Sequence, residues 1–372
     1  MAAGGRAAAR PRAASLPAAA AVERAALTTP LALLFLAALA ALSVVTAGCG
    51  EGPQARAPRQ ADSGAHSAAM DPRTQLDPPA LADQPAAIAA DGGVPVLCYH
   101  YFRGRFSPGY ALRVFGAVVL GLPALGPREF WTTPVAEFER HLRALKAAGY
   151  TVVTLDDLAD DVAAGRPLPP RAVVLTIDDA DESVYRHAFP LLRRYGVPAH
   201  VFVPTGHVGR RWSGLRVCSA DHLREMQASG LVRLESHTHD LHRKGLDGDQ
   251  VVPVFLHPER WQRIRETGGD PVRADLVASR RAVAALAGPR RAWLAWPYGF
   301  ATAELDSLAR ACGFRGTVSL KPRPFGPADS GLSVGRFAVT AHTTTAGVAA
   351  LLAPAAPAAG PDSAGTGAGG GS

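Results

Sequence analysis

Two kinds of hydrophobic pattern alternate along the chain from about residue 91 to residue 354. Short apolar runs predict buried strands, and apolar residues three and four positions apart predict amphipathic helices. The predicted strands cover 94–100, 151–155, 172–179, 198–204, 232–239, 292–299, 316–320 and 334–340. The predicted helices cover 134–150, 156–165, 183–196, 219–230, 270–288 and 302–313. This alternation predicts one α/β domain with a parallel sheet or a (β/α) barrel.

The patterned region is flanked by segments without periodicity. Residues 49–90 are rich in Ala, Pro, Asp, Gln and Ser, and residues 355–372 form a low-complexity tail that ends in Gly and Ser. Such compositions cannot bury enough apolar surface to fold. We therefore predict a disordered tether, a folded domain over 91–354 and a disordered tail.

The N-terminal 48 residues have the features of an export signal. A basic stretch up to Arg24 precedes the apolar run at 30–45, which is short for a membrane span. The sequence TAGC then places Cys49 after small residues and resembles the lipidation site of bacterial lipoproteins, although Thr46 departs from the usual Leu. We expect an exported protein that is anchored to a membrane by lipid on Cys49, in the periplasm or at the cell surface. A plain secretory signal and an uncleaved anchor remain alternatives.

Charge and cysteine content narrow the class further. The formal charge is +7 over 372 residues, but four arginines and one glutamate precede Cys49, so much of the excess lies in the signal. No basic run or basic helix is present, which argues against a nucleic-acid partner. Cys98, Cys218 and Cys312 lack the CxxC spacing of a zinc site. They fit either one disulfide and one thiol or three buried thiols.

Four of the predicted strands end in residues that hydrolytic metal sites use. His100 ends the first strand, and Asp178 and Asp179 end the third. The fifth strand runs into 237–242, which holds three histidines, and the sixth runs into Tyr298. The carboxyl ends of parallel strands meet at one face of the fold, so we expect these side chains to gather there.

Each of these signals also has an ordinary structural interpretation. Paired aspartates often cap helices or occupy solvated turns, and Asp181 is itself predicted to cap the helix that follows. Histidines on a loop are usually just exposed. Two adjacent buried carboxylates, however, raise the pKa of one of them unless a cation lies nearby. His, His and Asp suit a divalent metal with an open coordination position.

Three of these segments resemble the motifs of the polysaccharide deacetylases, the NodB-homology domain of carbohydrate esterase family 4. The family motif T-F-D-D-G is similar to 176–180 (TIDDA), the histidine motif to 236–242 (SHTHDLH), and the P-Y-G motif to 297–299. The resemblance covers about 94–340 and implies a distorted (β/α) barrel. The five-residue step from His237 to His242 is similar to the branch that deacetylates poly-β-1,6-N-acetylglucosamine, a biofilm exopolysaccharide, and this branch includes exported lipoproteins.

The resemblance also implies roles for the residues. Asp179, His237 and His242 would hold the metal, with Zn²⁺ expected first and Co²⁺ or Ni²⁺ as alternatives. Asp178 would be the general base that takes a proton from the attacking water.

The resemblance leaves two histidines as candidates for the acid that protonates the leaving amine. His100 lies at a predicted strand end, whereas His342 lies near the C-terminus in the sequence TAH. We prefer His100 because of its strand-end position. Tyr298 would donate its backbone N–H to the oxyanion, as its family counterpart does.

The sequence departs from the family pattern at two positions near the base. Ala180 stands where the motif has Gly, so a positive φ there would cost roughly 1 kcal/mol or more. Ala295 stands where many members carry an arginine that orients the base, so we expect Asp178 to be less firmly held.

Substrate contacts are predicted from the same segments. Among Trp131, Trp212, Trp261 and Trp296, the last is the best candidate to line the groove because it adjoins Pro297. His239 either lines the groove or is exposed. The polar insert at 243–267 is expected to form a loop near the site.

These observations together predict a metal-dependent N-deacetylase of an N-acetylglucosamine polymer, with the poly-β-1,6-linked exopolysaccharide as the first candidate. Its partners would be the polysaccharide, the membrane and a polysaccharide synthesis or export system. Two alternatives stay open. One is the same chemistry on peptidoglycan, chitin oligomers or an O-acetyl ester, and the other is a catalytically inactive glycan-binding protein.

Overall fold

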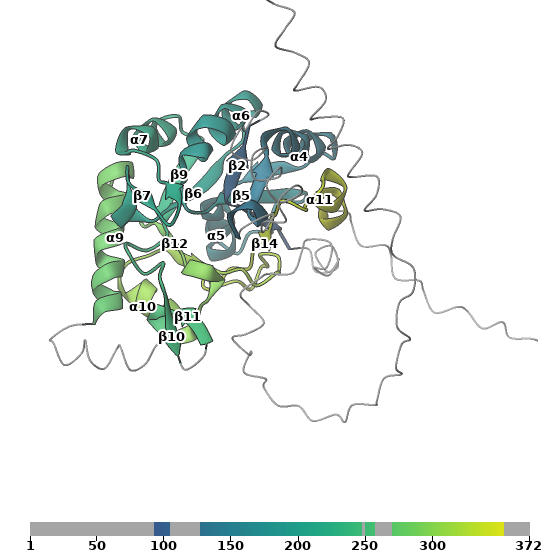
Figure 1. Cartoon of the computed structure of the whole chain (residues 1–372). Coiled ribbons are helices and arrows are strands. Elements are labelled where there is room, and N and C mark those ends of the chain that lie inside the picture. Colours follow the sequence, from purple (N-terminus) through teal and green to yellow (C-terminus); the bar gives the residue numbers. More distant parts are fainter. Residues whose placement is uncertain (1–92, 105–126, 248–249, 257–269, 353–372) are drawn as a thin grey trace, which may run out of the picture. The chain divides into compact units, whose positions relative to one another are not determined.

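Eight parallel strands form the central sheet of the computed structural model, which describes residues 93–104, 127–247, 250–256 and 270–352 (Figure 1). The strands are β1 (Val96–Tyr99), β4 (Thr151–Val153), β5 (Ala172–Ile177), β6 (Ala199–Val203), β9 (Val232–Ser236), β12 (Trp293–Ala295), β13 (Gly316–Val318) and β14 (Phe337–Ala338). Their order is β13-β12-β9-β6-β5-β1-β14, and β4 pairs with the start of β5. The predicted parallel α/β barrel is confirmed. It is open, because β13 and β14 do not pair with each other in the described part of the chain.

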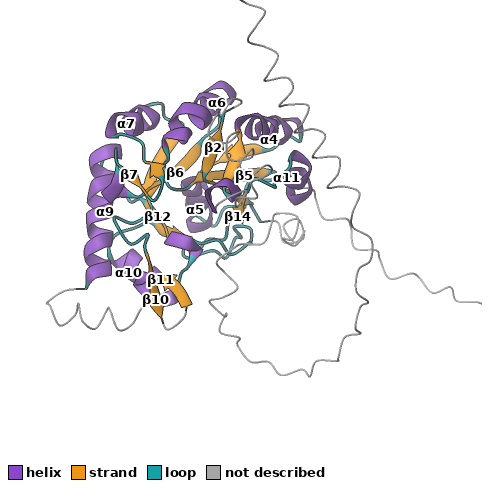
Figure 2. Cartoon of the chain, viewed as in Figure 1, coloured by secondary structure: helices purple, strands orange, loops and turns teal. Residues whose placement is uncertain are grey.

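Helices connect successive strands and cover the sheet (Figure 2). They are α3 (Pro127–Phe130), α4 (Val135–Ala147), α5 (Leu155–Ala163), α6 (Phe189–Tyr195), α7 (Ala220–Ala228), α9 (Pro271–Ala287), α10 (Ala303–Ala311) and α11 (Thr345–Leu352). A π-helical segment, Val184–Ala188, leads into α6, and short 3-10 turns lie at Thr205–His207, Val254–Leu256 and Pro297–Gly299. All six predicted helices are present, whereas α3 and α11 were not predicted.

Three two-stranded sheets lie outside the central sheet. They are β2 (Tyr101–Arg103) with β3 (Thr132–Pro134), β7 (Arg211–Trp212) with β8 (Leu215–Arg216), and β10 (Lys244–Asp247) with β11 (Gln250–Pro253). The last pair lies within the insert that was expected to form a loop. Residues 248–249 and 257–267 of that insert, which include Trp261, fall outside the described residues.

The two faces of the sheet bury different side chains, as the twofold alternation of a strand requires. On β5, Leu175 and Ile177 pack in the core beneath α4, α6 and α7, whereas Val174 packs on the opposite face with Phe202 and Trp293. A third cluster joins α9 and α10 to β12. Each fully buried large apolar side chain contributes about 1.5–3 kcal/mol.

Short polar side chains fix where the helices begin. The Ser219 hydroxyl accepts a hydrogen bond from the amide of His222 at the start of α7, and Thr154 forms a reciprocal capping box with Asp157 at α5. Asp181 accepts a hydrogen bond from the amide of Ser183, which confirms its predicted capping role. These caps set the path of the chain immediately after the strands.

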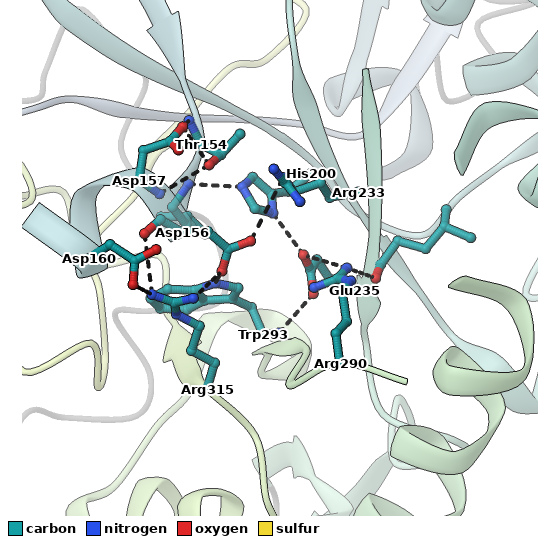
Figure 3. A network of polar contacts seen from close by, with 12 residues as sticks. Thr154, Asp156, Asp157, Asp160, His200, Arg233, Glu235, Arg290, Trp293 and Arg315 are labelled. Carbon is teal, nitrogen blue, oxygen red and sulfur yellow. Dashed lines mark hydrogen bonds and ion pairs between the residues drawn. The ribbon is translucent and has the colours of Figure 1, made fainter. Parts of the chain in front are cut away.

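A buried polar network, which we call the Glu235 network, ties β6, β9, β12 and α5 together (Figure 3). Its members are His200, Glu235, Arg290 and the amide of Trp293. One Glu235 oxygen accepts from His200 and Arg290 at 2.9 Å each, and the other accepts from the Trp293 amide at 2.7 Å. The Leu155 amide donates to Nε2 of His200, so the proton of this imidazole is on Nδ1. Each polar atom of His200 and Glu235 therefore has a partner.

The remaining sequence predictions concern thiols and the termini. Cys98, Cys218 and Cys312 are free and buried. Of the two alternatives, the structure therefore has three buried thiols and not a disulfide with one thiol. Cys49, the signal segment 1–48, the tether 49–90 and the tail 355–372 lie outside the described residues. Among the helices that are described, none is long and apolar enough to cross a membrane.

Candidate active site

The carboxyl ends of four strands of the central sheet bring the predicted site residues together. Asp178 and Asp179 follow β5, His237 follows β9, and His100 follows β1. Tyr298 follows β12 in a 3-10 turn. The gathering that parallel topology predicted is therefore confirmed.

Asp179, His237 and His242 form a group with the geometry of a metal site. One ligand atom from each lies within 4.8 Å of the others. The Asp179 Oδ1 atom lies 3.4 Å from Nε2 of His237 and 3.7 Å from Nε2 of His242. It is buried and accepts no hydrogen bond among the described residues. A buried carboxylate oxygen that faces two imidazole nitrogens and has no donor fits a divalent cation between them.

The carboxylates and burial set the protonation of these residues. The Ala295 carbonyl accepts a hydrogen bond of 2.8 Å from Nδ1 of His237, which directs Nε2 at Asp179. Burial lowers the pKa of His237, but Asp179 and Asp178 outweigh it and raise the pKa. Burial lowers the pKa of His242 to about 4, so this imidazole is neutral at pH 7. Burial opposes ionisation of Asp179, but His237 and His242 outweigh it and lower the pKa of the carboxyl group.

Tyr101 supports the metal group and was missed by the sequence analysis. Its hydroxyl donates to Oδ2 of Asp179, the oxygen that faces away from the two histidines. The side chain is 8% exposed. Such a partner orients a ligand carboxylate. The available signal was its position directly after His100 at the strand end.

Arg336 holds the candidate base. Its guanidinium donates to both oxygens of Asp178, at 2.7 and 2.8 Å, and is fully buried. Burial alone would raise the pKa of Asp178, but the Arg336 charge outweighs it and lowers the pKa. The expectation that Ala295 leaves the base loosely held is wrong, because an arginine from the last predicted strand performs this task. An arginine within the apolar sequence VGRFAV was the signal.

His100 lies beside the base. Its Nε2 atom is 4.0 Å from Oδ2 of Asp178, and its ring centroid is 4.2 Å from that of Trp131. Its Nδ1 atom is buried without a hydrogen-bond partner in the described chain. Burial lowers the pKa of His100. His342, the rival for this role, is exposed and contacts Phe130 instead.

The backbone at the site is strained in a way that regular strands are not. Asp179, Ala180, Thr238 and Tyr298 have φ values of 65°, 45°, 66° and 59°. Positive φ is unfavourable for residues other than Gly, and it persists where the surrounding structure enforces it. The conditional expectation of strain at Ala180 is confirmed.

Three predicted substrate contacts do not reach an open groove. Trp296 is fully buried against Phe255, and its indole N–H donates to Asp306, so the expectation that it stacks on a sugar is wrong. Pro297 is also buried and serves to position the turn at Tyr298.

His239 turns away from the metal group. Its Nδ1 atom lies 3.0 Å from the Thr205 hydroxyl, and its amide donates to Asp275 of α9. It is half-buried and is not among the metal-group residues. His239 therefore has a structural role and does not line the groove.

Other aromatic residues line the pocket in place of Trp296. A cavity of about 150 Å³ is bounded by Tyr101, Trp131, Trp212 and the metal-group residues Asp179 and His242. The Trp212 ring meets that of His242 edge to face, with centroids 4.9 Å apart. Apolar ring faces beside a polar centre suit a sugar ring.

The insert approaches the other side of the metal group. The Tyr298 ring centroid lies 4.4 Å from that of His242, and Nζ of Lys244, at the start of β10, lies 4.6 Å from the Tyr298 centroid. The insert therefore adjoins the site at Lys244, as expected. Beneath Tyr298 the backbone has no room, because a Cβ atom on Gly299 would lie 2.5 Å from Leu320.

Comparison with known proteins gives the same picture. Residues 165–317 match the family model for polysaccharide deacetylases. The structure of IcaB from Ammonifex degensii is 33% identical and covers 70% of this chain and 97% of its own, with a TM-score of 0.57. The deacetylase domain of BpsB from Bordetella bronchiseptica is 27% identical over 67% of this chain and 97% of its own, with a TM-score of 0.51.

A curated relative points in the same direction. The poly-β-1,6-N-acetyl-D-glucosamine N-deacetylase of Staphylococcus aureus is 26% identical over 206 residues, which are 55% of this chain and 67% of the relative. The matched family region contains the paired aspartates, both metal-group histidines and Tyr298. The chain belongs to the polysaccharide deacetylase family of hydrolases.

Proposed function

We propose that this protein removes N-acetyl groups from poly-β-1,6-N-acetylglucosamine and releases acetate, with Zn²⁺ as its metal. The observation that carries the chemistry is the pair of adjacent aspartates in different surroundings. Asp179 faces two histidines with an unpaired oxygen, whereas Asp178 is clamped by Arg336. The name of the relative from Staphylococcus aureus supports the choice of polymer.

The residues divide the reaction between them. A divalent metal held by Asp179, His237 and His242 would supply Lewis acidity to the attacking water and the acetyl carbonyl. Asp178 takes a proton from the water while the water oxygen forms a bond to the carbonyl carbon of the acetyl group. Arg336 keeps Asp178 ionised and fixes both of its oxygens.

Collapse of the adduct breaks the C–N bond. The proton that Asp178 took from the water passes to His100, whose Nε2 atom lies 4.0 Å from Oδ2 of Asp178, and His100 gives it to the departing nitrogen. This position beside Asp178 supports His100 over His342. The Tyr298 amide donates to the oxyanion, which is the role that its strained turn suits. Acetate leaves, and the sugar keeps a free amine that becomes protonated.

The setting of the reaction is part of the proposal. Lipid on Cys49 would hold the protein at a membrane in the periplasm or on the cell surface, and the tether at 49–90 would let the domain reach a polymer. A polysaccharide synthesis or export system is the natural source of such a substrate.

Acetate release from poly-β-1,6-N-acetylglucosamine tests the proposal. The full chain would be assayed after chelation and after addition of Zn²⁺, Co²⁺ or Ni²⁺, beside Asp178→Asn. We expect metal-dependent release that falls by about 10²–10⁴-fold in the variant. Release from chitin oligomers, peptidoglycan or an O-acetyl ester alone would overturn the substrate and keep the mechanism. Glycan binding without release from any of them would show an inactive glycan-binding protein.

A further inference from the structure

A second cavity, of about 230 Å³, lies beside the active-site pocket and is rich in arginine. Its charged lining consists of Arg128, Arg186, Arg211, Arg216, Asp181 and Glu182. The metal-group residues do not line it, and the mechanism above does not use it. Its composition contrasts with that of the active-site pocket, where aromatic rings surround the metal group.

The two cavities adjoin each other and share two lining residues. Arg128 and Leu215 line both of them. Arg128 is fixed between the two by a hydrogen bond of 2.8 Å to the Gly214 carbonyl and by an ion pair of 3.3 Å with Asp181. The second cavity therefore lies next to the pocket in which a reacting sugar of the polymer would bind.

The hairpin of β7 and β8 supplies two of the arginines that line the second cavity, and their placement is unfavourable for folding. Arg211 and Arg216 lie directly opposite each other in its register. Like charges at cross-strand positions are destabilising. Glu182 compensates the charge of Arg216, at 3.5 Å, whereas no described residue compensates that of Arg211. The charge of Arg211 is therefore available to the cavity.

The charge in the cavity does not balance. Arg128 pairs with Asp181, and Arg186 and Arg216 both approach Glu182, at 2.9 and 3.5 Å. Arg211 pairs with no described residue. Four guanidinium groups thus face two carboxylates, and the excess is positive.

We propose that this cavity is a subsite for the neighbouring sugar that accepts N-acetylglucosamine and disfavours glucosamine. The inference rests on the proposed function. Each turnover converts a neutral acetamide into an ammonium group, so a positive subsite repels a stretch of polymer that has already reacted. The enzyme would then leave amines spaced along the polymer rather than in blocks.

Defined β-1,6-linked oligosaccharides test the subsite. The full chain with Zn²⁺ is given a fully acetylated pentamer or a pentamer with one internal glucosamine, and acetate release and product sequence are followed by mass spectrometry. A unit charge at about 8 Å in surroundings close to water changes binding by roughly two- to sixfold. We therefore expect the acetylated pentamer to be preferred by about threefold or more in low salt, and the preference to shrink in 0.5 M NaCl.

Charge-reversal variants distinguish an effect of the cavity's own charge from an effect of the protein's net charge. Arg211→Glu removes the excess charge of the cavity, and we expect it to abolish the preference and to produce adjacent amines. Arg224→Glu makes the same change of charge on α7, outside both cavities, and should keep the preference.

The outcomes distinguish the two proposals. No release from either pentamer would overturn the proposed function, and the subsite with it. Equal release from both pentamers by the unmodified protein, or an unchanged preference in Arg211→Glu, would overturn the subsite alone.

Discussion

Two buried groups of histidine and carboxylate in the described part of the chain resemble each other in composition, and one of them has the features of a site. The Glu235 network and the active-site cluster, which comprises His100, Asp178, Asp179, His237, His242 and Arg336, use the same residue types. Both include a buried carboxylate held by an arginine, Glu235 by Arg290 and Asp178 by Arg336. Burial and composition alone do not tell them apart.

The difference lies in hydrogen bonding and backbone strain. Each polar atom of His200 and Glu235 has a partner, and both residues lie in regular strands. The unpaired buried atoms of the Glu235 network are Nε and Nη1 of Arg290, which are hydrogen-bond donors. In the active-site cluster, Nδ1 of His100 and Oδ1 of Asp179 are buried without one. Positive φ values also gather around that cluster. A carboxylate oxygen can bind a metal and an imidazole nitrogen can carry a proton, whereas the unpaired Arg290 atoms can only donate. The kind of unpaired atom, together with the backbone strain, therefore indicates a ligand or a reaction at the active-site cluster.

Loss of Arg336 should have the largest effect because it acts on both stability and chemistry. Arg336→Gln leaves Asp178 buried without its counter-charge, which costs about 3–5 kcal/mol of the free energy of unfolding. Burial then raises the pKa of Asp178. The base must be ionised, so the acidic limb of the kcat profile moves to higher pH.

Arg290→Gln is the matched control for that experiment. It removes the arginine of the Glu235 network, so we expect a loss of stability with the pH profile of kcat unchanged. Denaturant unfolding and pH–rate profiles of both variants measure the two effects. An acidic limb that stays in place in Arg336→Gln would contradict the role assigned to Arg336.

Loss of Glu235 should give the next largest effect, and on stability alone. Glu235→Gln leaves the Arg290 charge partly buried without its partner, and we expect a loss of about 3 kcal/mol in urea unfolding. The folded fraction should keep its kcat, because no residue of this network contacts the active-site pocket. A kcat that falls by tenfold in fully folded protein would give the network a part in the reaction.

Addition of metal should stabilise the protein through the group of Asp179, His237 and His242 and not through the Glu235 network. Zn²⁺ at a concentration of 100 times its Kd stabilises the folded state by about 2.7 kcal/mol. His237→Gln should abolish this gain, whereas His200→Gln should lower the starting stability and keep the gain. Thermal unfolding with and without Zn²⁺ decides the matter, and an equal gain in both variants would place the metal elsewhere.

The sequence predicted those parts of the molecule that depend on local pattern. Hydrophobic periodicity located the six connecting helices, and parallel topology gathered Asp178, Asp179, His237 and His100 at one face. These inferences hold because strand ends in a parallel barrel share a direction.

The parts that could not be predicted depend on contacts between distant segments. Arg336 is 158 residues from Asp178 along the chain, and no spacing rule links them. Trp296 adjoins the P-Y-G motif, yet its ring is buried in the core. The pocket is lined instead by Trp131 and Trp212, which come from other segments of the chain. Adjacency in sequence to a motif is therefore weak evidence for adjacency in space.

Relief of the strain at Ala180 should have the smallest effect. This residue has a φ of 45°, which Gly adopts more easily by roughly 1 kcal/mol, but it is also fully buried in the core. We expect Ala180→Gly to raise the free energy of unfolding by up to about 1 kcal/mol. Ala188→Gly, at an equally buried position in the π-helical segment, should lower it by about 1 kcal/mol, because Gly is unfavourable within a helix. Equal losses in the two variants would show that the turn after Asp179 is unstrained, and the contrast between the two buried groups would then rest on hydrogen bonding alone.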